Sequence, residues 1–151
     1  MILPFSQFMH KSSSGAVYNL KIHLVIVTKY RYKVINAPIL KRLEEIFSAT
    51  CIKWECTLLE FNGEVDHVHA LIDLNPKVAP SKFVNSLKTV SSRLIRKEFS
   101  EYLSRFYKKP VLWSIGYAVN SCGGASLEKI KDYIKNQNAT VSDPKIPLRP
   151  N

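Results

Sequence analysis

The sequence predicts an α+β fold, because segments with strand periodicity alternate with two segments of helical periodicity. Residues 17–30 are rich in β-branched and aromatic side chains. Their apolar positions first alternate with polar ones and then become continuous, as in a strand that enters a buried sheet. Residues 38–47 and 80–95 instead repeat apolar side chains at helical spacing. Each of these segments begins at a proline, which suits the first turn of a helix.

Three further segments have the composition of strands, at residues 54–61, 65–74 and 111–120. Asn62-Gly63, between the first two of them, predicts a hairpin turn. The predicted order is therefore β-α-β-β-α-β, which is the ferredoxin-like split βαβ arrangement. Four strands and two helices would form a two-layer sandwich.

The ends of the chain differ from this central part. Residues 1–16 are predicted to be an N-terminal arm, residues 17–140 a single domain, and residues 141–151 an irregular tail with three prolines. Gly123-Gly124 interrupts the chain after the last strand, and Ser126 is a suitable N-cap for an extra C-terminal helix that ends near Asn138. This extra helix carries Tyr133.

The composition favours a polyanionic partner. Lys and Arg number 22 against 12 Asp and Glu, for a formal charge of +10, and 46% of the residues are hydrophobic, which suffices for a core. Charge alone fits either nucleic acid or an anionic membrane surface. However, the longest apolar run, residues 24–27, is far shorter than the ~20 residues of a membrane span, and the N-terminus lacks a secretory pattern. We therefore expect a cytoplasmic, nucleoid-associated protein without a membrane partner. Its three cysteines have no CxxC spacing and are predicted to be reduced.

The sharpest local motif is Asp66-His67-Val68-His69. In a strand, residues i and i+2 point to the same face, about 6.6 Å apart. The two imidazoles can therefore close on a single cation. A His-x-His pair is also common by chance, so the alternative is two half-exposed histidines without a role.

A second pair, Tyr133 and Gln137, is spaced i, i+4 and shares one face of the predicted C-terminal helix. Either residue is ordinary on a helix surface. Combined with the histidines, however, they outline one site with a nucleophile and a further metal ligand. A tyrosine has an ordinary pKa of about 10 and needs activation to attack at neutral pH, and a metal can polarise the phosphoryl oxygens. No GxxxxGK[ST] phosphate loop occurs, so no nucleotide cofactor is expected.

Cations interleaved with aromatic residues suit single-stranded nucleic acid, which offers phosphates and unstacked bases together. Tyr30 and Tyr32 are interleaved in this way with lysine and arginine. A solvated helix face is the alternative for any single cation. The candidate DNA-binding residues are Lys29, Arg31, Lys33, Lys88 and Arg93.

These motifs together resemble the single-tyrosine HUH transposases, the small TnpA-type (IS200-like) enzymes of insertion sequences. The likeness covers nearly all of residues 18–138. The matching segments, in order, are residues 23–31, the metal motif 66–71, residues 112–117 and the nucleophile segment 133–137. Val65, where many relatives have proline, and Ala118, where they have a bulkier residue, depart from the pattern.

The resemblance implies a divalent metal, Mg or Mn, bound by His67, His69 and Gln137. It implies that Tyr133 attacks single-stranded DNA to form a 5′-phosphotyrosine during excision and insertion at element ends with subterminal hairpins. It also implies a homodimer in which the Tyr133 helix of one subunit can complete the metal site of the other. His23 matches the family, but we interpret it as structural or near the site and not as a ligand.

Three other interpretations remain open. Another HUH endonuclease, such as a domesticated repeat-processing enzyme, a relaxase or a replication initiator, would share the chemistry. A non-catalytic ferredoxin-like nucleic-acid-binding module would leave His67, His69, Tyr133 and Gln137 as coincidences, and the RNA-binding signature of such modules is missing from the sequence. A zinc hydrolase that activates water would need a third ligand and a base beyond Gln137.

Overall fold

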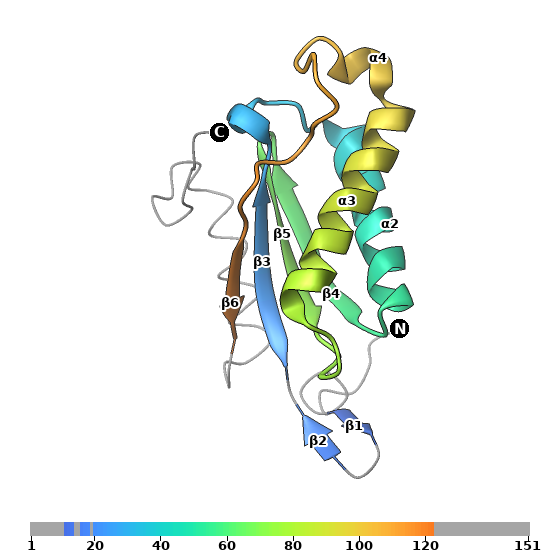
Figure 1. Ribbon diagram of the computed structural model, residues 1–151, viewed down its shortest axis with the longest axis vertical. Coiled ribbons are helices and arrows are strands. Elements are labelled where there is room, and N and C mark those ends of the chain that lie inside the picture. The colour runs from blue at the N-terminus through green and yellow to red at the C-terminus, as the bar shows by residue number, and fades with distance from the viewer. Residues whose placement is uncertain (1–10, 14–15, 19, 123–151) are drawn as a thin grey trace.

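Four antiparallel strands form the main sheet of the protein, which a computed structural model describes over residues 11–13, 16–18 and 20–122 (Figure 1). The strands are β3 (Lys21–Val27), β4 (Thr57–Glu64), β5 (His67–Asp73) and β6 (Ala118–Ser121). They lie in the spatial order β4-β5-β3-β6, with β3 and β5 in the centre. The predicted mixed α+β architecture with a four-stranded sheet is confirmed.

Two long helices, α2 (Ala37–Lys53) and α3 (Pro80–Glu98), cover one face of this sheet (Figure 1). α2 begins after Asn36, whose side chain accepts a hydrogen bond of 3.0 Å from the Ile39 backbone N–H. Pro38 lies in the first turn of α2 and Pro80 in the first turn of α3, as predicted. A short helix, α4 (Ser100–Leu103), follows α3.

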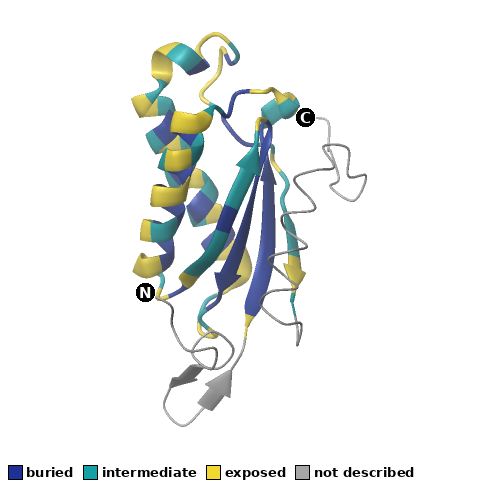
Figure 2. Ribbon diagram, turned by 180° about the vertical axis from the view of Figure 1, so that it is seen from behind, coloured by how far each residue is buried: buried dark blue, intermediate teal, exposed yellow. Residues whose placement is uncertain are grey.

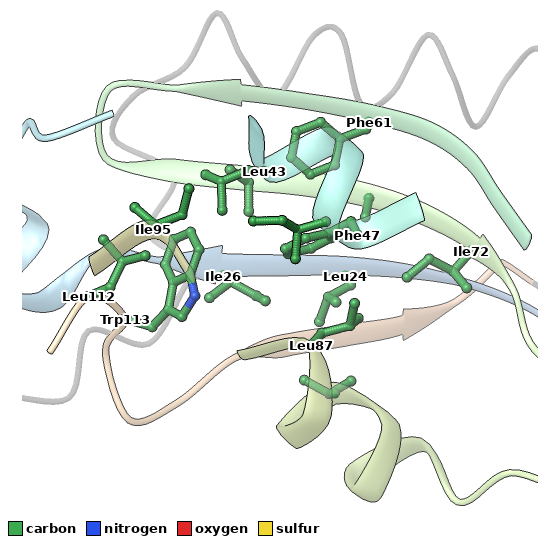
Figure 3. Close-up of a cluster of buried hydrophobic side chains, with 14 of the residues drawn as sticks. Leu24, Ile26, Leu43, Phe47, Phe61, Ile72, Leu87, Ile95, Leu112 and Trp113 are labelled. Carbon is green, nitrogen blue, oxygen red and sulfur yellow. The ribbon is translucent and has the colours of Figure 1, made fainter. Parts of the chain in front are cut away.

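The apolar core lies between this helical layer and the sheet (Figure 3). Its fully buried members come from both layers: Leu24 and Ile26 of β3, Ile72 of β5, Leu43 and Phe47 of α2, and Phe83, Leu87 and Ile95 of α3. Trp113 closes one end, where its indole N–H donates a hydrogen bond of 2.9 Å to the Ser91 hydroxyl of α3. This packing holds β3 and β5 rigidly against the helices.

The predicted hairpin turn at Asn62-Gly63 is wrong, because both residues lie inside β4 and pair with β5. The chain turns instead at Val65 and Asp66. Gly63 has a different role, which is close approach. A Cβ atom at this position would lie 2.7 Å from Leu40 Cδ1 and 3.0 Å from the His67 carbonyl oxygen. The lack of a side chain therefore allows α2 to pack tightly against the end of β4.

The first and last strands are shorter than predicted. Residues 17–30 are divided between β2 (Ala16–Tyr18), which pairs with β1 (Lys11–Ser13), and β3, which gives way to the 3-10 helix η1 (Lys29–Arg31). Part of the predicted arm, residues 1–16, thus forms a small hairpin. Of the predicted last strand, 111–120, only the end from Ala118 onward is in β6, and Trp113 forms an isolated bridge with Thr28.

None of the helices in the described part of the chain has the length and apolarity needed to cross a membrane.

Candidate metal and nuclease site

The two histidines of the HxH motif lie on the sheet face opposite the helices. Alternation along β5 sends Val68 and Ala70 into the apolar core, so the side chains of His67 and His69 project from the other face. Their cross-strand neighbours on β3 are Val27 and Val25. Both histidines are buried, with exposed fractions of 2% and 1%, and they belong to the buried central strands in Figure 2. The expectation of half-exposed rings under the alternative is therefore wrong, and metal binding by the two histidines stays a prediction.

The two imidazoles contact each other, with ring centroids 4.7 Å apart and planes at 85°. His67 is held by the residue that precedes it, because its Nδ1 lies 2.7 Å from Asp66 Oδ1. The other carboxylate oxygen of Asp66 forms an ion pair of 3.3 Å with Arg31 Nε. Asp66 thus connects the histidine to the η1 segment.

His69 is oriented by a residue from the neighbouring strand. Its Nδ1 lies 3.3 Å from His23 Nε2, and the two rings are nearly parallel, at 12°. Burial lowers the pKa of His23 from its ordinary value, which favours the neutral ring. The prediction that His23 is near the site agrees with this contact.

This donor arrangement fits a divalent metal. With Nδ1 of His67 engaged by Asp66 and Nδ1 of His69 engaged by His23, each ring would ligate through Nε2. Among the described residues, no group of three His, Cys, Asp or Glu side chains could hold a metal, so the two histidines would need at least one further ligand. Gln137, the expected third ligand, and Tyr133, the expected nucleophile, lie outside the described residues.

The structure gives different surroundings to the five candidate DNA-binding residues. Lys33 and Arg93 are exposed, and Lys29 is partly buried with its ammonium 5.5 Å from the Tyr30 ring centroid. Arg31 is engaged with Asp66. These four residues remain predictions as DNA contacts.

Lys88 contributes to the architecture in addition to any role with DNA. Its ammonium donates to the carbonyl oxygens of Ser114, Ile115 and Gly116 at 2.7, 2.8 and 3.4 Å. Burial, and secondarily the nearby charge of Lys29, lowers the pKa of Lys88. Lys88 therefore fixes the irregular segment before β6 to α3, which explains why the predicted strand is short there.

Sequence reasoning did not assign roles to the residues that orient the histidines. For Asp66, its position next to His67 in the motif was the one sequence feature that could have indicated this contact. The pairing of Arg31 with Asp66 and of His23 with His69 depends on the strand register, which joins residues 46 positions apart in the latter case.

Comparisons with known proteins show the family of this chain. The sequence profile of the family described as "Transposase IS200 like" matches residues 16–137. The transposase for insertion sequence element IS200 of Salmonella typhimurium is 32% identical over 127 residues, which cover 84% of this chain and 82% of the relative. The ISDra2 transposase TnpA of Deinococcus radiodurans is 26% identical over 138 residues, covering 91% and 96% respectively.

Solved structures show the same relationship. A crystal structure from Deinococcus radiodurans R1, described as a candidate transposase, has a TM-score of 0.69 and 28% identity, covering 85% of this chain and 98% of the other. A REP-associated tyrosine transposase bound to a REP hairpin has a TM-score of 0.54 at 9% identity, covering 82% and 68%, and shares the fold alone. The chain belongs to the IS200-like transposases, a family whose members cleave DNA and transfer strands.

Proposed function

We propose that this protein cleaves and rejoins single-stranded DNA at insertion-sequence ends through a covalent 5′-phosphotyrosine at Tyr133. The observation that carries the proposal is the pair of buried histidines, His67 and His69, whose Nδ1 atoms are engaged by Asp66 and His23. Such a pair would ligate one divalent cation, Mg or Mn, through the Nε2 atoms, and Gln137 is the proposed third ligand. The proposed fold is ferredoxin-like with an extra C-terminal helix that carries Tyr133 and Gln137.

The proposed cleavage conserves the energy of the phosphodiester. The Tyr133 phenolic oxygen forms a bond to the scissile phosphorus and loses its proton to solvent. The bond between phosphorus and the 3′ oxygen breaks, and that oxygen takes up a proton to become a free 3′ hydroxyl. Rejoining reverses these steps with the 3′ hydroxyl of another strand, so no ATP is required. When bound, the metal would polarise the phosphoryl oxygen and orient the scissile bond.

The residues of this chain prepare the site in two ways. Burial of His67 and His69 in the sheet keeps their rings in fixed rotamers, and Asp66 and His23 hold the ring nitrogens in position. We further propose DNA with subterminal hairpins as the substrate and a homodimer with active sites shared between subunits. These two parts rest on family membership.

A covalent-trapping assay tests the proposal. Labelled single-stranded DNA that carries the element end is incubated with the protein and Mg or Mn and run on a denaturing gel. We expect an SDS-stable adduct that disappears on chelation and in Tyr133→Phe. Tyr102→Phe, which changes a tyrosine after α3, is the matched control and should form the adduct normally. Binding of cognate DNA without an adduct, with either metal, would favour the non-catalytic module instead.

A further inference from the structure

The segment that joins β3 to α2 has an unusual backbone. Tyr30 and Arg31 adopt left-handed conformations, with φ of 61° and 54°. This region is disfavoured for residues with a Cβ atom, and particularly for bulky ones. Strain of this kind persists only where the surrounding structure enforces it, and it concentrates at functional sites. Local conformational preference therefore does not explain the left-handed backbone of Tyr30 and Arg31.

Contacts from three directions enforce the conformation. The Thr28 N–H donates to the Asp66 carbonyl at 2.9 Å, and the Lys29 N–H donates to the Leu112 carbonyl at 2.8 Å. The Tyr107 hydroxyl donates to the Lys29 carbonyl at 2.7 Å. Arg31 pairs with the same Asp66 that holds His67. Segment 28–32 is therefore fixed relative to the candidate metal ligands.

Three tyrosine rings form a series that leads from the protein interior to solvent. Tyr107 is buried and stacks on Tyr32, with centroids 5.5 Å apart and planes at 19°. Tyr32 contacts Tyr30 at 5.3 Å. Exposure rises along the series, to 41% for Tyr32 and 59% for Tyr30. The Lys29 ammonium lies 5.5 Å from the Tyr30 ring centroid.

Stability does not account for Tyr30. Its ring is the most exposed of the three and buries the least apolar surface, and its backbone conformation is one that glycine or asparagine adopts more readily. An exposed aromatic ring with a cation beside it, on a rigid support, instead has the features of a stacking site for an unpaired base next to a phosphate. Arg31, the residue after Tyr30, is connected to His67 through Asp66, by contacts of 3.3 and 2.7 Å.

We propose that Tyr30 and Tyr32 form a stacking platform for an unpaired DNA base beside the phosphate that is cleaved, with Lys29 contacting the adjoining phosphate. This assignment rests on the proposed function for its location beside the scissile bond. The platform holds the strand beside the segment that Asp66 connects to the histidine pair. Arg31 supports the platform through its ion pair with Asp66.

Binding of the full-length protein to two strands of equal charge tests the platform. One is an oligothymidylate of about 12 nucleotides, and the other is an abasic strand of the same length. We expect fluorescence anisotropy at low salt to show that the wild type prefers the thymidylate strand by about five- to tenfold. Tyr30→Gly should lose most of this preference, whereas Tyr30→Phe should keep it.

A stability measurement separates this effect from misfolding. Because glycine suits the left-handed backbone, Tyr30→Gly should unfold at an unchanged or slightly higher temperature than the wild type. Tyr30→Asn, which also tolerates this conformation, is a second variant with the same expectation for binding. Equal preference for the thymidylate strand in the wild type and both variants would overturn the platform.

The two proposals can fail separately. If the wild type forms the metal-dependent adduct but Tyr30→Gly binds both strands as the wild type does and forms the adduct at the same rate, the platform is wrong and the tyrosine chemistry stands. If the base preference depends on Tyr30 but no adduct forms with cognate DNA, the platform stands as a single-strand contact and the proposed cleavage is wrong.

Discussion

The two faces of strand β5 are built from different interactions. On the helix side, Val68, Ala70 and Ile72 belong to an apolar cluster that spans both layers of the domain. On the opposite side, His67 and His69 are equally buried but are held by individual polar contacts. Both faces are thus inaccessible to solvent, and the same backbone supports them.

The difference shows how one strand separates stability from chemistry. Apolar contacts are non-directional and additive, so the helix side contributes most of the folding free energy. The polar contacts contribute little net free energy each, but they fix the orientation of the rings. Substitutions on the helix side should therefore lower the free energy of unfolding and leave metal affinity unchanged. Substitutions on the histidine side should lower metal affinity more than stability.

The largest effect is expected for Phe47→Ala on the helix side. Phe47 is fully buried and packs edge-on against Phe61, with centroids 5.1 Å apart. Its truncation should lower the free energy of unfolding by about 3–5 kcal/mol, measured by urea denaturation. The remaining folded protein should bind Mn with wild-type affinity. Phe47→Leu is a milder variant if the alanine variant does not fold. A specific loss of metal affinity in folded Phe47→Leu would show that the two faces are not separable.

On the opposite face, His23→Leu should affect metal binding more than folding. The substitution places an apolar side chain of similar size in the sheet but removes the Nε2 atom that lies 3.3 Å from Nδ1 of His69. This atom would accept the Nδ1–H of His69 when His69 ligates through Nε2. Loss of an orienting contact to a metal ligand typically weakens affinity by about 10- to 100-fold. Titration with Mn, followed by electron paramagnetic resonance, measures this without any DNA.

A conservative variant serves as the control for that experiment. His23→Gln retains an oxygen that can accept the same hydrogen bond, so it should recover part of the lost affinity. Unchanged Mn affinity in His23→Leu would mean that His23 is a packing residue only. A fall in unfolding free energy as large as that of Phe47→Ala would place His23 with the core instead.

Sequence periodicity was enough to predict this division of the strand, because alternation is a local property. Spacing alone correctly assigns His67 and His69 to one face and Val68 and Ala70 to the other. Helix starts at Pro38 and Pro80 were also predictable, since proline fixes φ at a compatible value.

What the sequence could not supply are contacts that depend on register and on close packing. His23 meets His69 only because β3 pairs with β5 in one register, and Arg31 reaches Asp66 only because η1 adopts a left-handed backbone. Lys88 is a candidate DNA-binding residue, and its hydrogen bonds to three carbonyl groups were not predictable from spacing. Asn62-Gly63 has the composition of a turn, but here the glycine is required by the packing of α2.

Substitution of Gly63 should have the smallest effect on stability and on metal affinity. Gly63 lies close both to Leu40 of the helical layer and to the backbone of His67. In Gly63→Ala, the new methyl group would meet the mobile end of Leu40 at 2.7 Å, but also the His67 carbonyl at 3.0 Å. Leu40 is only partly buried and can move, so the free energy of unfolding should fall by about 1 kcal/mol, the lower end of the cost of overpacking. The carbonyl belongs to the β4–β5 ladder and can yield only by shifting the backbone of His67. Mn affinity should therefore fall slightly, by about two- to fivefold, which is less than the loss typical of direct removal of an orienting contact.

A double variant with Leu40→Ala, which makes room for the methyl group, is the control. If it restores stability but not Mn affinity, the strain acts through the backbone of β5. If Leu40→Ala restores both stability and Mn affinity, the contact with the His67 carbonyl does not affect the metal site. The two faces are then independent at this point as well.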